Sequence, residues 1–233
     1  MKQKLLKNKI FYFFYKLLKI QRNKSPSHHF GEFAEDVFIG RLLKDIENGK
    51  YVDVGCYHPF KGSLTAKLYQ KNWSGINIDI SKTSIDLFNI ARKKDINLNC
   101  AISNFNGKTF FFQNGIINQQ NSLLKSNENQ VKVDINCYTL NSVLESHGFN
   151  DFDYLNVDVE GTELDVIKSI DLIKYRPKLI SIENNELLLE EYFKSEIYKL
   201  LDQNNYVFIN KIGVTNFFII NDLKYEIPNL IKV

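Results

Sequence analysis

Cysteine is scarce in this 233-residue chain, and its three cysteines, Cys56, Cys100 and Cys137, are far apart and form no CxxC pair. Their number and spacing argue against a disulfide framework and a cysteine-rich zinc site, and they fit a reducing compartment such as the cytoplasm. The apolar fraction of 44% and the charged fraction of 24% are those of an ordinary globular protein. Disordered, collagen-like and membrane-bundle classes are therefore excluded, and the length suits one large domain.

Acidic residues are absent from the first 24 positions, which carry seven lysines and Arg22, a charge of +8. The remainder of the chain has 22 basic and 27 acidic residues, so its net charge is −5. A mildly acidic body argues against a nucleic-acid-binding domain, and we expect no nucleic-acid partner.

The same basic segment lacks an apolar run long enough to span a membrane. Its longest run, Ile10 to Tyr15, has six residues, whereas a spanning helix needs about 20. The run is also short for a signal-peptide core, and no small-residue cleavage site follows it. Apolar residues nevertheless recur at helical spacing between residues 5 and 20, with lysines between them. The pattern predicts a basic amphipathic helix within residues 1–26, followed by one domain over residues 27–233.

Two interpretations of this helix remain open. An interfacial helix would place its aromatic residues in the acyl boundary and its lysines on anionic head groups. Residues 1–24 would then hold a cytoplasmic protein peripherally on the inner face of the membrane. In the other interpretation, the helix packs on its own domain or on a second subunit of a homodimer.

From Phe30 onward, strand-like and helix-like segments alternate. Strands are expected at 51–54, 75–80, 98–102, 110–112, 131–138, 154–157, 179–182, 206–209 and 216–220. Helices are expected at 30–46, 63–69, 83–92, 140–146, 162–173 and 187–201, with Thr83 and Asp86 as a capping box. This alternation predicts an α/β fold with a mostly parallel sheet and an antiparallel closing pair. Such sheets bind ligands beyond the carboxyl ends of their strands.

The first two strand ends indicate a nucleoside-bearing cofactor. Gly55 directly follows a buried strand, where it lets the backbone turn and approach a ligand. Asp79 ends the next strand, 24 residues later, and an acidic residue at about this distance holds the two ribose hydroxyls of a nucleotide. The alternative is an ordinary turn glycine and a solvated aspartate.

The loop after Gly55 lacks the second and third glycines of a dinucleotide site. Bulky residues from Cys56 to Phe60 stand in their place, which disfavours NAD and FAD because helix amides could not reach a pyrophosphate. S-adenosylmethionine carries no phosphate and needs only one close approach of the backbone.

Five segments resemble the FkbM family of S-adenosylmethionine-dependent methyltransferases. They are YVDVGCYHPFKGS, GINIDIS, CAIS, DYLNVDVEGTELDVIKSI and PKLISIEN, in this order between residues 30 and 218. The resemblance implies a Rossmann-like, seven-stranded class I methyltransferase sheet. It also implies a set of cofactor-binding residues: Asp53, Gly55, Cys56, Asp79, Ile80, Cys100, Ala101, Ile102 and Asp158. In that set, Asp79 would hold the ribose, residues 100–102 would flank the adenine, and Asp158 would face the methyl donor.

Carboxylates cluster after the strand at 154–157. Asp158, Glu160 and Glu163 lie within six residues, and methyl transfer to a hydroxyl requires a group that takes or shares the proton of the nucleophile. Glu163 stands at helix-start spacing, where a carboxylate stabilises the helix N-terminus. The catalytic candidates are therefore Asp158 and Glu160 from this cluster, together with His58 from the loop after Gly55.

Glu183 and Asn184 follow the next strand, 25 and 26 residues after Asp158. With Asp158 they resemble the metal triad of catechol-type O-methyltransferases, and carboxylate and amide oxygens suit Mg²⁺ or Mn²⁺. In the alternative without metal, Glu183 accepts hydrogen bonds from substrate or a loop amide.

Taken together, the residues predict an S-adenosylmethionine-dependent O-methyltransferase. The resemblance points to a hydroxyl acceptor on a sugar or a cell-surface glycan precursor, and so to polysaccharide biosynthesis. Two other classes stay open: a nicotinamide-dependent oxidoreductase, and a non-catalytic module that binds a membrane or a partner through residues 1–24.

Overall fold

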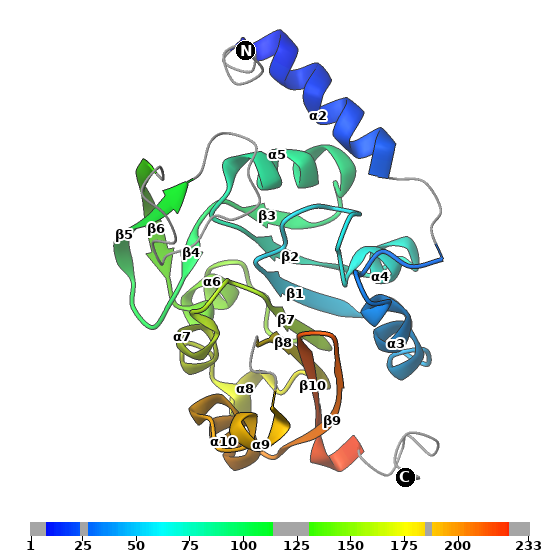
Figure 1. Ribbon diagram of the computed structural model, residues 1–233, viewed down its shortest axis with the longest axis vertical. Coiled ribbons are helices and arrows are strands. Elements are labelled where there is room, and N and C mark those ends of the chain that lie inside the picture. Colours follow the sequence, from blue (N-terminus) through cyan, green and yellow to red (C-terminus); the bar gives the residue numbers. More distant parts are fainter. Residues whose placement is uncertain (1–7, 24–27, 114–130, 185–187, 224–233) are drawn as a thin grey trace.

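A seven-stranded sheet forms the centre of the computed structural model, which describes residues 8–23, 28–113, 131–184 and 188–223 (Figure 1). Its strands are β1 (Lys50–Val54), β2 (Ser74–Ile78), β3 (Ile96–Leu98), β7 (Tyr154–Val157), β8 (Leu179–Glu183), β9 (Tyr206–Ile212) and β10 (Thr215–Ile220). The strand order is β3-β2-β1-β7-β8-β10-β9. Neighbouring strands are parallel except at β10, which runs antiparallel to β8 and β9. The predicted α/β sheet with an antiparallel closing pair is confirmed.

Helices cover both faces of this sheet. One face packs against α3 (Glu35–Leu42), α4 (Ala66–Gln70) and α5 (Lys82–Ala91). The other packs against α6 (Leu140–Ser146), α7 (Glu163–Lys168), α8 (Leu172–Tyr175), α9 (Leu189–Tyr192) and α10 (Glu196–Gln203). A separate three-stranded sheet contains β4 (Ala101–Ile102), β6 (Val131–Tyr138) and β5 (Gly107–Gln113), in that order, and a 3₁₀ turn, η1 (Asn221–Leu223), follows β10.

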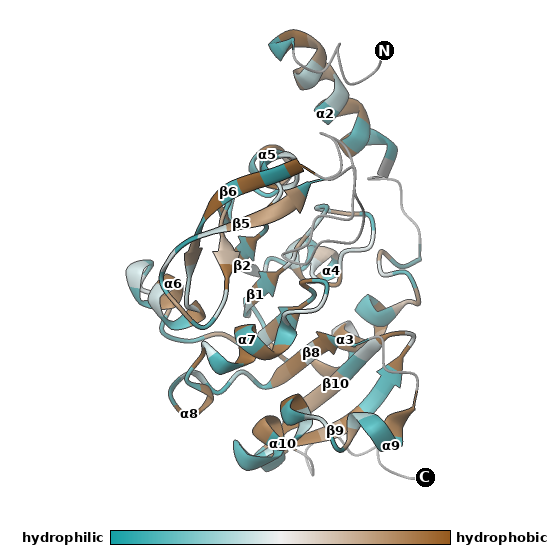
Figure 2. Cartoon of the chain, turned by 60° about the vertical axis from the view of Figure 1, so that its left-hand side comes forward, coloured by the Kyte–Doolittle hydropathy of each residue, from teal (hydrophilic) through white to brown (hydrophobic). Residues whose placement is uncertain are grey.

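Helix α2 (Lys9–Asn23) lies outside the α/β body, next to α5, and carries both polar and apolar patches (Figures 1 and 2). The Tyr12 hydroxyl is 3.1 Å from both Thr83 Oγ1 and Asp86 Oδ2, and Lys16 Nζ is 3.6 Å from Asp86 Oδ2. The predicted N-terminal helix is therefore present and meets the body through a polar side. In the described part of the chain, no helix is long and apolar enough to cross a membrane. The domain boundary predicted after Pro26 lies outside the described residues.

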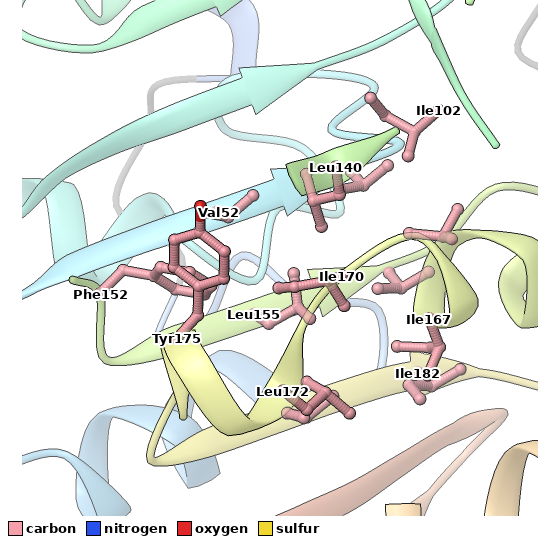
Figure 3. Close-up of a cluster of buried hydrophobic side chains, with 14 of the residues drawn as sticks. Val52, Ile102, Leu140, Phe152, Leu155, Ile167, Ile170, Leu172, Tyr175 and Ile182 are labelled. Carbon is pink, nitrogen blue, oxygen red and sulfur yellow. The ribbon is translucent and has the colours of Figure 1, made fainter. Parts of the chain in front are cut away.

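The core follows from alternation along the buried strands. In β1, Val52 and Val54 pack among the residues that face α6 to α10, whereas Tyr51 faces the α3 side. Figure 3 shows Val52 and Leu155 of the sheet beside Ile167, Leu172 and other residues of the covering helices. Because parallel strands are covered on both faces, the face toward α6 to α10 is apolar, and the other face holds both apolar and buried polar residues.

Several element boundaries differ from the sequence prediction because local hydrogen bonds decide them. Ser81, rather than Thr83, is the N-cap of α5 and accepts from the Ser84 amide. The helix predicted over 162–173 is broken, because Asp171 accepts from two following amides and begins a new helix. Ser195 divides the helix predicted over 187–201 in the same way. The strand predicted at 98–102 belongs partly to each sheet, as β3 and β4.

The face of the sheet beneath α3 to α5 carries a row of buried polar side chains. Asp53 of β1 is in register with Asn156 of β7, which is in register with Ser181 of β8. Asn156 Nδ2 donates to Asp53 Oδ1 at 2.9 Å, and Ser181 Oγ donates to Asn156 Oδ1 at 2.6 Å. Tyr154 closes the row with a 2.6 Å bond between its hydroxyl and Ser181 Oγ. Each buried polar group thereby gains a partner, which removes most of the cost of its burial.

Arg92, just beyond α5, joins this row to the loop after β1 and has no exposed surface. Its Nη2 donates to Pro59 O at 2.6 Å and to Ser63 Oγ at 2.7 Å. Its Nη1 donates to Thr65 Oγ1 at 2.7 Å, and that hydroxyl donates to Asp53 Oδ2 at 2.8 Å. One buried guanidinium therefore fixes both ends of the loop from Pro59 to Thr65.

We predict that Arg92→Leu lowers the free energy of unfolding by about 3–5 kcal/mol, because it leaves several buried acceptors and a carboxylate without their cation. The matched control, Arg41→Leu at an exposed position of α3, changes it by about 0.5 kcal/mol or less. Urea denaturation of both variants measures the difference. Equal stabilities would contradict a central role for Arg92.

Candidate active site

The carboxyl ends of β1, β2, β7 and β8 open into one cavity of about 360 Å³. The parallel register explains this convergence, since Val54 pairs with Ile78 on one side and with Val157 on the other. The cavity is lined by the whole predicted cofactor set, Asp53, Gly55, Cys56, Asp79, Ile80, Cys100, Ala101, Ile102 and Asp158, and by the three catalytic candidates. Glu183 also lines it, whereas Asn184 is not among the lining residues.

Gly55 brings β1 and β7 together at the floor of the cavity. Its φ of +84° is accessible mainly to glycine, and a Cβ built there would lie 1.6 Å from the carbonyl oxygen of Asp158. Its amide donates to Ile78 O at 2.9 Å, so the same residue is also tied to β2. No side chain fits at this position, because the Asp158 carbonyl group fills the space of a Cβ, and Gly55 lines the cavity through its backbone.

Asp79 is held by the backbone on both oxygens. Oδ2 accepts from the Tyr57 amide at 2.8 Å, and Oδ1 accepts from the Ser81 amide at 2.6 Å. Burial raises the pKa of Asp79 to about 6, and these two bonds oppose the shift. A carboxylate has about four acceptor positions, so two remain for a ligand that donates a pair of hydroxyls.

Asp53 belongs to the polar row and is fully buried. Burial raises its pKa, while its bonds to Asn156 and Thr65 oppose the shift. Because each carboxylate oxygen already has a partner within the protein, Asp53 fixes the cavity floor and the loop above it.

The wall beyond β2 is apolar. Cys100, Ala101 and Ile102 are buried, and Ile80 is partly exposed. Burial raises the pKa of Cys100 to about 12, so its thiol stays protonated at neutral pH and provides surface rather than a nucleophile. The three cysteines are all free. A flat aromatic base fits against such a wall.

A pair of carboxyl groups occupies the opposite side. Asp158 follows β7 and Glu183 ends β8, two strands that are neighbours in register, and their side chains are hydrogen-bonded to each other. Burial, this bond and the charges of Glu183 and Glu160 raise the pKa of Asp158 well above its usual value. Two carboxyl groups in contact share a proton unless a cation lies between them.

Glu160 completes this acidic side from the loop after β7. Its φ is +59°, a left-handed conformation that non-glycine residues adopt only where the surrounding structure enforces it. Burial and the charges of Glu183 and Glu163 raise its pKa. Glu163 itself accepts from the Gly161 amide at 2.9 Å and begins α7, as the sequence predicts.

His58 is 1% exposed, and its ring already has hydrogen-bond partners in the backbone. Nδ1 accepts from the amides of Phe60 at 3.1 Å and Lys61 at 3.0 Å, and the ring also bonds to the backbone of Lys19. Burial, with nearby Lys19, Arg92 and Lys61, lowers the pKa of His58 to about 3. A neutral ring used in this way positions the loop, which disfavours His58 as the general base.

Sequence reasoning missed several polar residues of the cavity, among them Thr162 and Asn156. Thr162 lines it, and its buried hydroxyl has no hydrogen-bond partner among the described residues. Thr162 stands at the N-cap of α7 without making a capping bond. Asn156 of β7 also lines the cavity, and a polar residue inside an otherwise apolar strand is the signal that could have identified it.

Two features define a class I methyltransferase. One is the strand order, with the antiparallel strand β10 between β8 and β9, and the other is the cavity at the carboxyl ends of β1 and β2. The chain belongs to the FkbM methyltransferase family, whose domain model matches residues 53–208. No curated protein matches the chain.

Two solved structures of similar fold are methyltransferases. A precorrin-6y C5,15-methyltransferase from Geobacter metallireducens is 9% identical, with a TM-score of 0.46 over 84% of this chain and 92% of that chain. A TehB-like SAM-dependent methyltransferase from Corynebacterium glutamicum is 8% identical, with a TM-score of 0.45 over 89% of this chain and 94% of that chain.

The residues present fit S-adenosylmethionine, the cofactor of this family. The backbone of Gly55 lines the cavity, Asp79 keeps two acceptor positions, and the wall formed by residues 100–102 is apolar. A dinucleotide fits poorly, because the helix after β1 begins only at Ala66 and presents no N-terminus at the strand end.

We predict that Asp79→Ala weakens binding of S-adenosylhomocysteine by about 1–3 kcal/mol, because two ribose hydroxyls lose their acceptor. Isothermal titration calorimetry measures the change. Asp151→Ala, at an exposed position before β7, is the control and leaves the affinity unchanged. Wild-type affinity in Asp79→Ala would remove this carboxylate from the ribose site.

Because the pKa of Asp79 is raised, the stability of the same variant, Asp79→Ala, should also depend on pH differently from that of the wild type. The folded protein binds this proton more tightly than the unfolded chain, so the contribution of Asp79 to stability falls as pH rises from about 4 to about 6. A shift from 3.8 to about 6 corresponds to roughly 3 kcal/mol. In urea denaturation, the stability of Asp79→Ala relative to wild type should therefore rise across this window. A difference independent of pH would contradict the raised pKa.

We predict that Thr162→Val keeps or increases the free energy of unfolding, because the buried hydroxyl of Thr162 makes no bond in the fold. Thr139→Val is the matched comparison, since the Thr139 hydroxyl caps α6 by accepting from the Ser142 amide. That variant should lose about 1 kcal/mol. Equal losses in the two variants would show that the Thr162 hydroxyl serves the fold rather than a ligand.

Proposed function

We propose that this protein is an O-methyltransferase that acts on a hydroxyl group of a sugar or cell-surface glycan precursor. The observation that carries the proposal is the hydrogen-bonded pair of Asp158 and Glu183 carboxyl groups in the cavity. Glu160 lies beside them, so the side of the cavity where the sugar would bind is rich in hydrogen-bond acceptors. Sugars present several hydroxyl donors, and carboxylates are suited to bind them.

The pair also supplies the proton chemistry that O-methylation needs. Bound S-adenosylmethionine supplies an electrophilic methyl group. Asp158 has a raised pKa, so its carboxylate takes a proton more readily than an exposed one. We assign proton removal from the acceptor hydroxyl to Asp158, and orientation of the acceptor to Glu183 and Glu160.

A divalent cation between Asp158 and Glu183 is the second candidate, favoured by the contact of two acidic groups. The donor set supports it less well. Asn184 is not among the lining residues, and no group of three or more His, Cys, Asp or Glu side chains in the described ranges is arranged to hold a metal. We therefore propose that the proton of the acceptor hydroxyl passes to the Asp158 carboxylate, without Mg²⁺ or Mn²⁺.

We further propose that the reaction is a modification step of polysaccharide biosynthesis in the cytoplasm, and the free, buried cysteines support a reducing compartment. The oxidoreductase alternative is disfavoured by the loop after β1. A non-catalytic module is disfavoured by Asp158 and Glu183, whose contact within the cavity serves no evident role in the fold.

We predict that Asp158→Asn lowers turnover by about 10²–10⁴, because the amide cannot take the proton of the acceptor hydroxyl. Transfer of a labelled methyl group to a panel of free and nucleotide-linked sugars measures it. Glu183→Gln should show a smaller loss, since it retains a hydrogen-bonding oxygen. Asp202→Asn, exposed on α10, is the control with unchanged turnover. Full activity of Asp158→Asn on an accepted sugar would refute this role.

The same assay separates the two candidates for the carboxyl pair. Without a metal, turnover persists after exhaustive chelation. Turnover that stops on chelation and returns with Mg²⁺ or Mn²⁺ would assign the pair to a cation instead.

A further inference from the structure

Helix α2 has an apolar side that its own domain leaves uncovered. The exposed large apolar residues of this helix are Ile10, Phe11, Phe13, Phe14 and Leu18, each exposed by about half or more. Tyr12 and Lys16, on the other side, make the contacts with α5 described above. The sequence left open whether the apolar side packs on the domain, and the structure turns it outward.

The charge of the N-terminal segment indicates what covers the apolar side of α2, its apolar stripe. Residues 1–24 carry eight basic residues and no acidic residue. A second copy of residues 1–24 would bring sixteen positive charges together, which disfavours self-association. Aromatic and aliphatic side chains flanked by lysines match an anionic bilayer, where rings enter the acyl boundary and lysines reach the head groups.

The helix also contacts residues that line the cavity. Thr83, which bonds to Tyr12, lines the cavity at the start of α5. Lys19 lines it as well, and its backbone bonds to the ring of His58 in the loop after β1. A surface that receives the outer side of α2 therefore lies near the cavity wall.

We propose that α2 docks this protein on an anionic lipid bilayer, with its apolar stripe in the interface and its polar side holding the cavity-bearing domain against the membrane. The docking concerns α2 alone and does not depend on the reaction proposed above.

Sedimentation of the full chain with lipid vesicles tests the docking without cofactor or acceptor. The wild type should bind vesicles that contain phosphatidylglycerol, bind weakly to pure phosphatidylcholine, and dissociate at high salt. The double variant Phe14→Glu with Leu18→Glu should lose roughly tenfold or more in affinity. Ile173→Glu is the matched control, because Ile173 is 77% exposed on α8, which covers the other face of the sheet from α5. It should bind as the wild type does.

Tryptophan fluorescence gives a second measurement, since the single tryptophan of the chain, Trp73, is buried. Phosphatidylglycerol vesicles should shift the emission of Phe14→Trp to the blue and leave that of Ile173→Trp unchanged. No vesicle binding by the wild type, or equal shifts in both variants, would overturn the proposal. A wild-type dimer that Phe14→Glu converts to a monomer, without lipid binding, would make a second copy the occupant.

Discussion

The site depends on one constraint, the close approach of the Gly55 backbone to the carbonyl group of Asp158. A side chain at position 55 would overlap that carbonyl, so only glycine lets the ends of β1 and β7 meet. This contact between the two strand ends fixes Asp158 beside the loop that follows Gly55. The register of β7 with β8 then sets Asp158 against Glu183. The loop that follows Gly55 is then held by Arg92, whose bonds lead back to Asp53 in the sheet.

This constraint divides the cavity into two chemical sides. Toward β2, Asp79 offers acceptor positions beside an apolar wall, which suits a nucleoside. Toward β8, three acidic side chains meet, and burial keeps the pKa of Asp158 high. Burying acidic groups together costs stability, as is common where a fold is shaped for a ligand or a reaction.

The sequence predicted the strand ends well and the interactions behind them poorly. Gly55, Asp79 and Asp158 could be identified because each follows a short apolar strand, and the ends of parallel strands meet at one edge. The buried role of Arg92 could not be predicted, because arginine is rarely buried and nothing in its neighbourhood marks it. Helical spacing gave the apolar stripe of α2, but only the three-dimensional contacts of Tyr12 show that this stripe faces outward.

A crystal structure of the protein with S-adenosylhomocysteine tests the assignment of the cavity most directly. The ribose hydroxyls should lie within hydrogen-bonding distance of Asp79, the amino acid portion beside Gly55, and the sulfur on the side of Asp158. Binding outside this cavity, or with the ribose away from Asp79, would contradict the assignment of the methyl-donor site.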